Sequence, residues 1–229
     1  TATVTKGTTA TPQPSATTPT SQPPATTSSR YSLNEALALN LVAIKINGYS
    51  GTTFGGVSSG DVVTISFQRQ KPELIKVSVP VGTVLVSDDP ARQNMVVMGL
   101  KGKDPSILGY YPVTEIALNT DEWQKYLFEA YCMNLSKSNI YTSTGFSLGE
   151  PASADIITML TTAKSLNPEL ATISAIQTAL WTLTDNPSRE ELQARFNIDD
   201  QTMANAWTIL DKAGLNPASK RLFAGYTPG

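Results

Sequence analysis

The hydrophobic period changes at Pro151, and this change constrains the fold more than any other feature of the chain. Before it, short apolar runs alternate with turn residues, a pattern typical of antiparallel strands. After it, apolar residues recur every three or four positions, as on one face of a helix. Strands followed by helices predict an α+β fold: an antiparallel β-sandwich or β-barrel over residues 31–150, and a helical subdomain packed on it over residues 151–229.

Individual strands and turns can be placed in the first part of the chain. Asn47-Gly48 predicts a turn, and segment 123–135 is ambiguous, although its aromatic content favours a strand. The other expected strands are the end of 37–46, then 61–68, 74–79, 83–86, 94–100 and 113–118. Trp123, Trp181 and Trp207 are expected in the core.

Helices are expected over residues 154–166, 172–183 and 200–213, and Ser188 with Glu191 predicts a capping box at the start of another. Two acidic pairs, Asp88-Asp89 and Asp199-Asp200, offer oxygen ligands for a divalent ion. The first pair precedes a proline in a turn and the second precedes a helix, where acidic residues are expected for structural reasons. We therefore expect neither a metal site nor a cofactor.

Residues 1–30 are dominated by threonine, proline, serine and alanine. Such a segment cannot bury enough apolar surface to fold alone, so it is expected to be an extended tail. Its composition fits either a stalk carrying O-linked glycans or a plain surface linker. Both favour an extracellular or cell-surface protein, from which we expect any signal peptide to have been removed.

The start of this tail has strand character. The β-branched residues Thr1, Thr3, Val4 and Thr5 alternate partly with smaller ones, which favours an extended strand. A strand of this kind could add to the sheet of a neighbouring copy, as in donor-strand addition. Lys6 follows directly and is the only lysine of the tail.

Composition excludes several functions. The chain has no histidine and one cysteine, which rules out a Ser-His-Asp triad, a Cys-His pair and an intramolecular disulfide. A net charge of −2 without a basic stripe argues against nucleic acid as a partner. No apolar run is long enough to cross a bilayer. We expect a protein that is not an enzyme. A secreted enzyme is a distant third hypothesis, behind adhesion and a structural role in a filament.

Cys132 and Gln177 are the residues with the most distinctive chemistry. A cysteine sulfur that displaces ammonia from a glutamine side chain forms an internal thioester. Cys132 lies among apolar neighbours, and Gln177 is expected on the inward face of its helix, where a polar group needs a partner. The alternative is structural: Cys132 is a small core side chain and Gln177 a polar residue on a helix surface.

The sequence around both residues resembles that of bacterial cell-surface thioester domains. Tyr131-Cys132-Met133-Asn134 is similar to the cysteine motif of that family. The segment 174–181, which contains Gln177 and ends at Trp181, is similar to the glutamine motif, and the resemblance covers roughly residues 131–187. It implies a β-sandwich and a helical subdomain that bring the two side chains together. It also implies adhesion, in which an amine on a target protein attacks the thioester and leaves an amide.

A second hypothesis is a structural subunit of an extracellular filament or pilus, assembled by donation of the N-terminal strand. In such a homopolymer the Lys6 amine could attack the thioester of the next copy and leave a cross-link to Gln177. Asn134-Leu135-Ser136 matches the N-glycosylation sequence, although its closeness to Cys132 argues against a bulky glycan.

Overall fold

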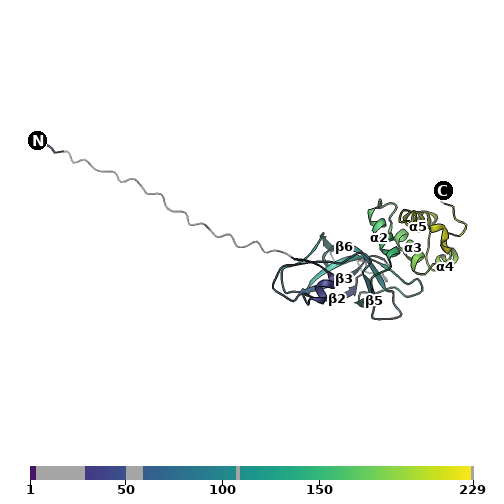
Figure 1. Ribbon diagram of the computed structural model, residues 1–229, viewed down its shortest axis with the longest axis horizontal. Helices are drawn as coiled ribbons and strands as arrows, with labels where there is room; N and C mark the ends of the chain where they lie inside the picture. Colours follow the sequence, from purple (N-terminus) through teal and green to yellow (C-terminus); the bar gives the residue numbers. More distant parts are fainter. Residues whose placement is uncertain (4–28, 50–58, 107–108, 228–229) are drawn as a thin grey trace.

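The computed structural model describes residues 1–3, 29–49, 59–106 and 109–227 (Figure 1). The strands in these residues are β1 (Ser29–Ser32), β2 (Val42–Gly48), β3 (Ser59–Arg69), β4 (Ile75–Ser78), β5 (Val84–Ser87), β6 (Met95–Ser106), β7 (Gly109–Pro112), β8 (Ile116–Leu118), β9 (Gln124–Cys132) and β10 (Gly145–Leu148). The α-helices are α1 (Leu33–Ala38), α2 (Ala154–Ser165), α3 (Ile173–Thr184), α4 (Arg189–Gln193) and α5 (Asp200–Lys212).

Six of the strands close into an antiparallel barrel. Their order is β5-β10-β2-β3-β9-β6, and pairing of β5 with β6 closes the ring. β7 pairs only with β6 and so extends the sheet outside the closed barrel. The prediction of a mixed α+β fold with antiparallel strands is confirmed, and the β part is a barrel.

β9 lies between β3 and β6, and it is buried along almost its whole length. α3 packs against this strand, and near the start of β9 the Tyr126 hydroxyl lies beside the Ala117 carbonyl of β8. Because both faces are covered, apolar residues occupy consecutive positions such as Tyr126, Leu127 and Phe128. This double burial explains why the sequence of β9 shows no clean alternation.

A second, three-stranded sheet has the order β1-β4-β8. β1 runs parallel to β4 and leads directly into α1, where Ser32 and Glu35 form a reciprocal capping box. Neither β1 nor α1 was predicted from the sequence. Its turn at Asn47-Gly48 is wrong, since both residues belong to β2. Gly48 is needed there because a Cβ would overlap the carbonyl of Tyr141.

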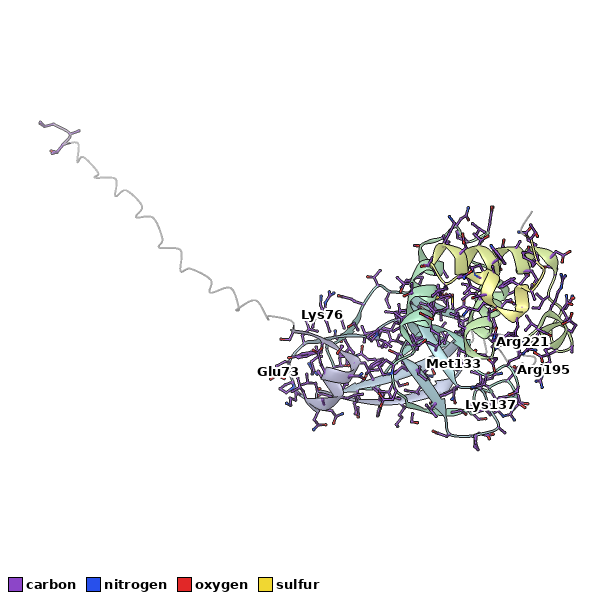
Figure 2. All side chains as sticks on the ribbon, turned by 45° about the vertical axis from the view of Figure 1, so that its right-hand side comes forward. Glu73, Lys76, Met133, Lys137, Arg195 and Arg221 are labelled. Atoms are coloured by element: carbon purple, nitrogen blue, oxygen red, sulfur yellow. The ribbon has the colours of Figure 1, made fainter. Side chains whose placement is uncertain are left out.

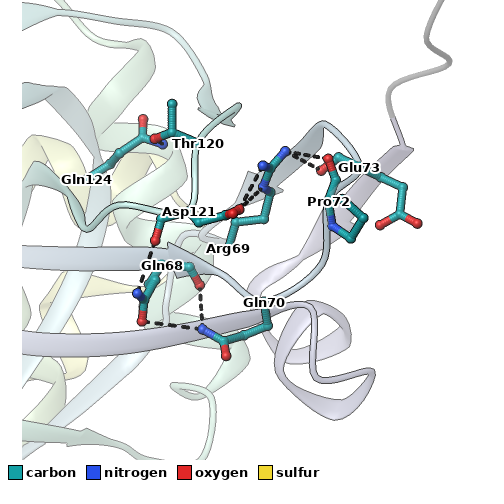
Figure 3. Close-up of polar contacts among 8 residues, drawn as sticks. All are labelled: Gln68, Arg69, Gln70, Pro72, Glu73, Thr120, Asp121 and Gln124. Carbon is teal, nitrogen blue, oxygen red and sulfur yellow. Dashed lines mark hydrogen bonds and ion pairs between the residues drawn. The ribbon is translucent and has the colours of Figure 1, made fainter.

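The end of β3 is tied to two loops by a cluster of polar contacts, drawn in Figure 3. The guanidinium of Arg69 lies 2.7 Å from the Asp121 carboxylate and donates to the carbonyls of Pro72 and Glu73. Gln68 donates to the Asp121 carbonyl. These bonds connect the barrel to the loops that lead into β4 and β9.

The helices α2, α3, α4 and α5 gather at one side of the barrel (Figure 1). α3 contacts α2, α5 and β9, so it is covered on several sides. Eight consecutive residues of it, Ala175 to Thr182, are buried. No helix among the described residues is long and apolar enough to cross a membrane.

The predicted core is confirmed for Trp181, and Trp207 packs partly buried against Phe223. It is wrong for Trp123, whose side chain is 40% exposed. The Lys45 ammonium lies 4.4 Å from the centre of that ring. A cation–π contact at the surface therefore takes the place of core packing.

Candidate functional site

Cys132 is the last residue of β9, opposite Met95 at the start of β6. Its side chain is fully buried and forms no disulfide. The thiol lies 3.8 Å from the Met95 sulfur, a weak polar contact. The strand pairing therefore holds the sulfur away from bulk water.

Gln177 lies on the second turn of α3. The Thr172 hydroxyl accepts a hydrogen bond from the Ala175 backbone N–H and caps the start of this helix. The Gln177 side chain faces the barrel and is 4% exposed. The expectation of an inward-facing glutamine is confirmed.

The structure brings the two residues into direct contact. The Cys132 backbone N–H donates to Gln177 Oε1 at 2.9 Å, and Gln177 Nε2 donates to the Cys132 carbonyl at 2.8 Å. One carboxamide thus satisfies both backbone groups of the residue that carries the thiol. This contact fixes the Gln177 side chain against Cys132.

Burial sets the protonation state of the thiol. Removal from water disfavours the thiolate and raises the pKa of Cys132 far above its ordinary value. The thiol is therefore neutral across the physiological pH range. A cysteine in this state is a poor nucleophile toward solutes in water.

Two buried polar atoms in the described residues have no hydrogen-bond partner: Thr178 Oγ1 and Trp181 Nε1. Both lie on α3 within about one turn of Gln177. Unpaired buried polar groups are rare and cost about 1–3 kcal/mol each. Their position beside Gln177 marks this turn of the helix as an unusual part of the core.

The motif neighbours of the two residues are also fixed by contacts. The Tyr131 hydroxyl donates to Glu129 Oε1 at 2.6 Å. Trp181 stacks on Phe196, with 4.4 Å between ring centres. Asn134 is half-buried, and its side-chain oxygen accepts a hydrogen bond from the Asn94 backbone N–H.

A buried glutamine that the sequence did not single out holds the segment after Cys132. Gln93 is 1% exposed; its Oε1 accepts from the Asn134 N–H, and its Nε2 donates to the Lys137 carbonyl, both at 2.9 Å. Asp185, at the end of α3, accepts from the Leu135 N–H. No local pattern distinguishes Gln93 from an exposed polar residue, because its partners are more than forty positions away.

Two residues of the predicted donor strand, Thr1 and Thr3, are not brought to this site. Thr1 and Thr3 are exposed and have no regular secondary structure, while Val4, Thr5 and Lys6 lie outside the described residues.

The acidic pairs have the structural roles that the sequence suggested. Asp199 caps α5, and Asp89 accepts from the Ala91 N–H in a turn. The described residues contain no cluster of three or more His, Cys, Asp or Glu side chains that could hold a metal.

No protein-family model matches the chain, and neither a curated protein nor a solved structure matches it.

Proposed function

We propose that Cys132 and Gln177 form an internal thioester, through which the protein attaches covalently to an amine on a target as a non-enzymatic extracellular adhesion module. The observation that carries this proposal is the pair of hydrogen bonds between the Gln177 carboxamide and the Cys132 backbone. They hold the Gln177 carboxamide against the backbone of the residue that carries the thiol, and both side chains are buried. The resemblance of both motifs to thioester domains supports the same proposal.

The reaction balances without a cofactor. The Cys132 sulfur attacks Gln177 Cδ, the carbon–nitrogen bond breaks, and the thiol proton leaves with the nitrogen as ammonia. Later, a primary amine attacks the same carbon, the carbon–sulfur bond breaks, and a proton from the amine restores the thiol. The final product is a secondary amide between Gln177 and the target.

The hydrogen bonds of the site favour this final product. Formation of the thioester removes Nε2 and leaves the Cys132 carbonyl without its donor, at a cost of about 1–3 kcal/mol. Attack by an amine returns an N–H to the same position. The secondary amide can then donate to that carbonyl again, while the Gln177 oxygen still accepts from the Cys132 N–H.

Burial also suits a thioester better than a reactive thiolate. The penalty that raises the pKa of Cys132 applies to a charged sulfur. A thioester is neutral, so it does not carry this penalty, and exclusion of water slows its hydrolysis. In this proposal residues 1–30 form an extended tether, 31–150 the β domain, and 151–229 a helical subdomain that positions Gln177.

Incubation with a biotinylated primary amine tests the proposal. We expect wild-type protein to become labelled and peptide mapping to place the label at Gln177. Cys132→Ala and Cys132→Ser should fold, as judged by circular dichroism, and take no label. Equal labelling of the wild type and a folded Cys132 variant would refute the proposal.

A second candidate is a filament subunit assembled by strand donation. In the described residues the outer edges of β1 and β8 have no neighbouring strand, so another copy could add a strand there. Removal of residues 1–10 should then abolish polymers in sedimentation experiments. Lys6→Arg should leave the polymers but remove those that resist boiling in SDS. Unchanged polymers after the truncation would eliminate this candidate.

A further inference from the structure

The segment after Cys132 lines an open pocket, which we call the basic pocket. Its volume is 570 Å³, within the range of roughly 300–1,000 Å³ common for small-ligand sites. Its lining comes from the loop before β6, the segment after β9 and the chain after α4: Arg92, Ser136, Lys137, Ser138, Asn139, Tyr141, Arg195 and Phe196.

The charges of the basic pocket are all positive. Arg92, Lys137 and Arg195 line it, and none of the lining residues is acidic. Figure 2 shows Lys137 and Arg195 on the same side of the molecule. The Asp89 carboxylate lies 3.5 Å from Nε of the Arg92 guanidinium. Three cations and no acidic side chain in the lining favour an anionic ligand.

The pocket is held in place by its backbone. Arg92 donates to the Asn139 carbonyl at 2.8 Å, and the Gln93 N–H donates to the Ser138 carbonyl at 3.0 Å. The Arg195 guanidinium donates to the Leu135 carbonyl at 3.2 Å. These bonds use only part of each guanidinium, so further N–H groups remain for a ligand. The Lys137 ammonium has no partner in the described part of the chain.

Neutral polar and aromatic groups complete the lining. The side chains of Ser136, Ser138 and Asn139 make no hydrogen bond to other described residues. The Tyr141 side chain is 50% exposed, although the Arg92 guanidinium lies 4.1 Å from its ring centre. Free hydroxyl and amide groups beside an exposed ring match a sugar, which offers many hydroxyls and an apolar ring face.

We propose that the basic pocket binds a carboxylate-bearing oligosaccharide. Arginine and lysine would bind the carboxylates, with arginine able to form paired hydrogen bonds. The serine, asparagine and tyrosine side chains would contact the sugar hydroxyls and ring. This inference goes beyond the proposed cross-link, since it requires neither the thioester nor a protein amine.

Isothermal titration calorimetry with tetragalacturonate as the probe tests this binding. We expect binding that weakens as the salt concentration rises, because salt screens exposed charges. Lys137→Gln and Arg195→Gln should each weaken it about tenfold, as expected for the loss of one charged hydrogen bond. Lys212→Gln makes the same charge change at an exposed position on α5 and should leave the affinity unchanged.

Two further ligands separate the contribution of the sugar rings to binding from that of the carboxylates. Neutral maltotetraose should not bind, and tetraglutamate should bind more weakly than tetragalacturonate. Tyr141→Ala should weaken tetragalacturonate binding about three- to tenfold and leave tetraglutamate binding unchanged.

The proposal is overturned if tetragalacturonate does not bind at millimolar concentration, or if Lys212→Gln weakens binding as much as Lys137→Gln. Equal binding of tetraglutamate would also overturn it and point to an acidic peptide.

Discussion

Gln177 and Gln93 perform the same structural task on one short segment. Both side chains are buried, and each uses its oxygen and its nitrogen to bond a backbone N–H and a backbone carbonyl. Gln93 joins two residues, Asn134 and Lys137. Gln177 bonds both groups of one residue, Cys132, which carries the thiol. Both glutamines make the same kinds of hydrogen bond, and the two sites differ because only Gln177 lies beside a thiol.

This comparison separates structure from chemistry. A buried glutamine whose side-chain oxygen and nitrogen both have a backbone partner is explained by stability alone, as Gln93 demonstrates. Gln93 is therefore an internal control for Gln177. Any property that the two glutamines share belongs to the fold, and only a property unique to Gln177 supports a thioester.

The largest expected effect is shared by both sites. Gln177→Ala leaves a buried backbone donor and acceptor unpaired, and Gln93→Ala leaves a partly buried donor and acceptor unpaired. We expect each substitution to lower the free energy of unfolding by about 2–4 kcal/mol. Urea denaturation measures this loss. Asn197→Ala removes an exposed carboxamide that bonds no other described residue, and it should change this free energy by less than about 0.5 kcal/mol. A loss at only one of the two buried glutamines would break the comparison.

Variants whose stability depends on pH make the comparison of Gln177 with Gln93 more specific. In Gln177→Glu and Gln93→Glu the new carboxyl group is buried, and it faces a backbone carbonyl that requires a donor. Both features raise its pKa in the folded state. Stability should therefore be greatest below the unfolded pKa of about 4.3 and fall as pH rises toward the folded pKa, by at most about 1.4 kcal/mol per unit.

Urea titrations from pH 4 to 7 measure this slope for both variants relative to wild type. A flat profile at either site would show that its carboxyl group reaches water.

The thiol itself distinguishes the two sites. Burial raises the folded pKa of Cys132 above the unfolded value of about 8.5. A free thiol would thus contribute stability that is present below pH 8.5 and lost above it, by up to about 1.4 kcal/mol per pH unit. Cys132→Ala lacks this contribution and provides the baseline for unfolding between pH 8 and 10.

A thioester has no proton to lose. In the cross-linked protein the excess slope relative to Cys132→Ala should therefore be absent, whereas it should return after treatment with methylamine. An excess slope in untreated protein would indicate a free thiol.

The smallest effect is expected at the surface of the same segment. Lys137→Gln removes an ammonium that has no partner among the described residues, so unfolding free energy should change by less than about 0.5 kcal/mol. A larger loss in urea denaturation would show that the Lys137 side chain, and not only its carbonyl, stabilises the segment held by Gln93.

The sequence predicts the main elements of the fold because their signals are local. Strand β3, helix α3 and the Ser188–Glu191 capping box follow from residue period and side-chain chemistry. β1 was missed because it is short and depends on its pairing with β4. α1 was missed although Ser32 and Glu35 form the same local capping-box pattern as Ser188 and Glu191. Barrel closure by pairing of β5 with β6 is a tertiary property that no single segment contains.

The candidate site follows the same rule. The single cysteine drew attention to Cys132, and the resemblance of segment 174–181 to a glutamine motif drew attention to Gln177. Helical spacing placed the glutamine on an inward face. Gln93 has an equally specific role, but its partners lie more than forty residues away. Cys132 and Gln177 could therefore be identified from the sequence, whereas the buried structural role of Gln93 could not.

The most direct test of the cross-link is the intact mass of denatured protein, with and without prior treatment of the native form with methylamine. We expect a native mass short of the sequence mass by one ammonia. Methylamine should restore a full chain with one adduct at Gln177, none at Gln93, and a Cys132 thiol that can be alkylated. A full, unmodified mass with Cys132 alkylated after unfolding would contradict the thioester and leave Gln177 with the purely structural role of Gln93.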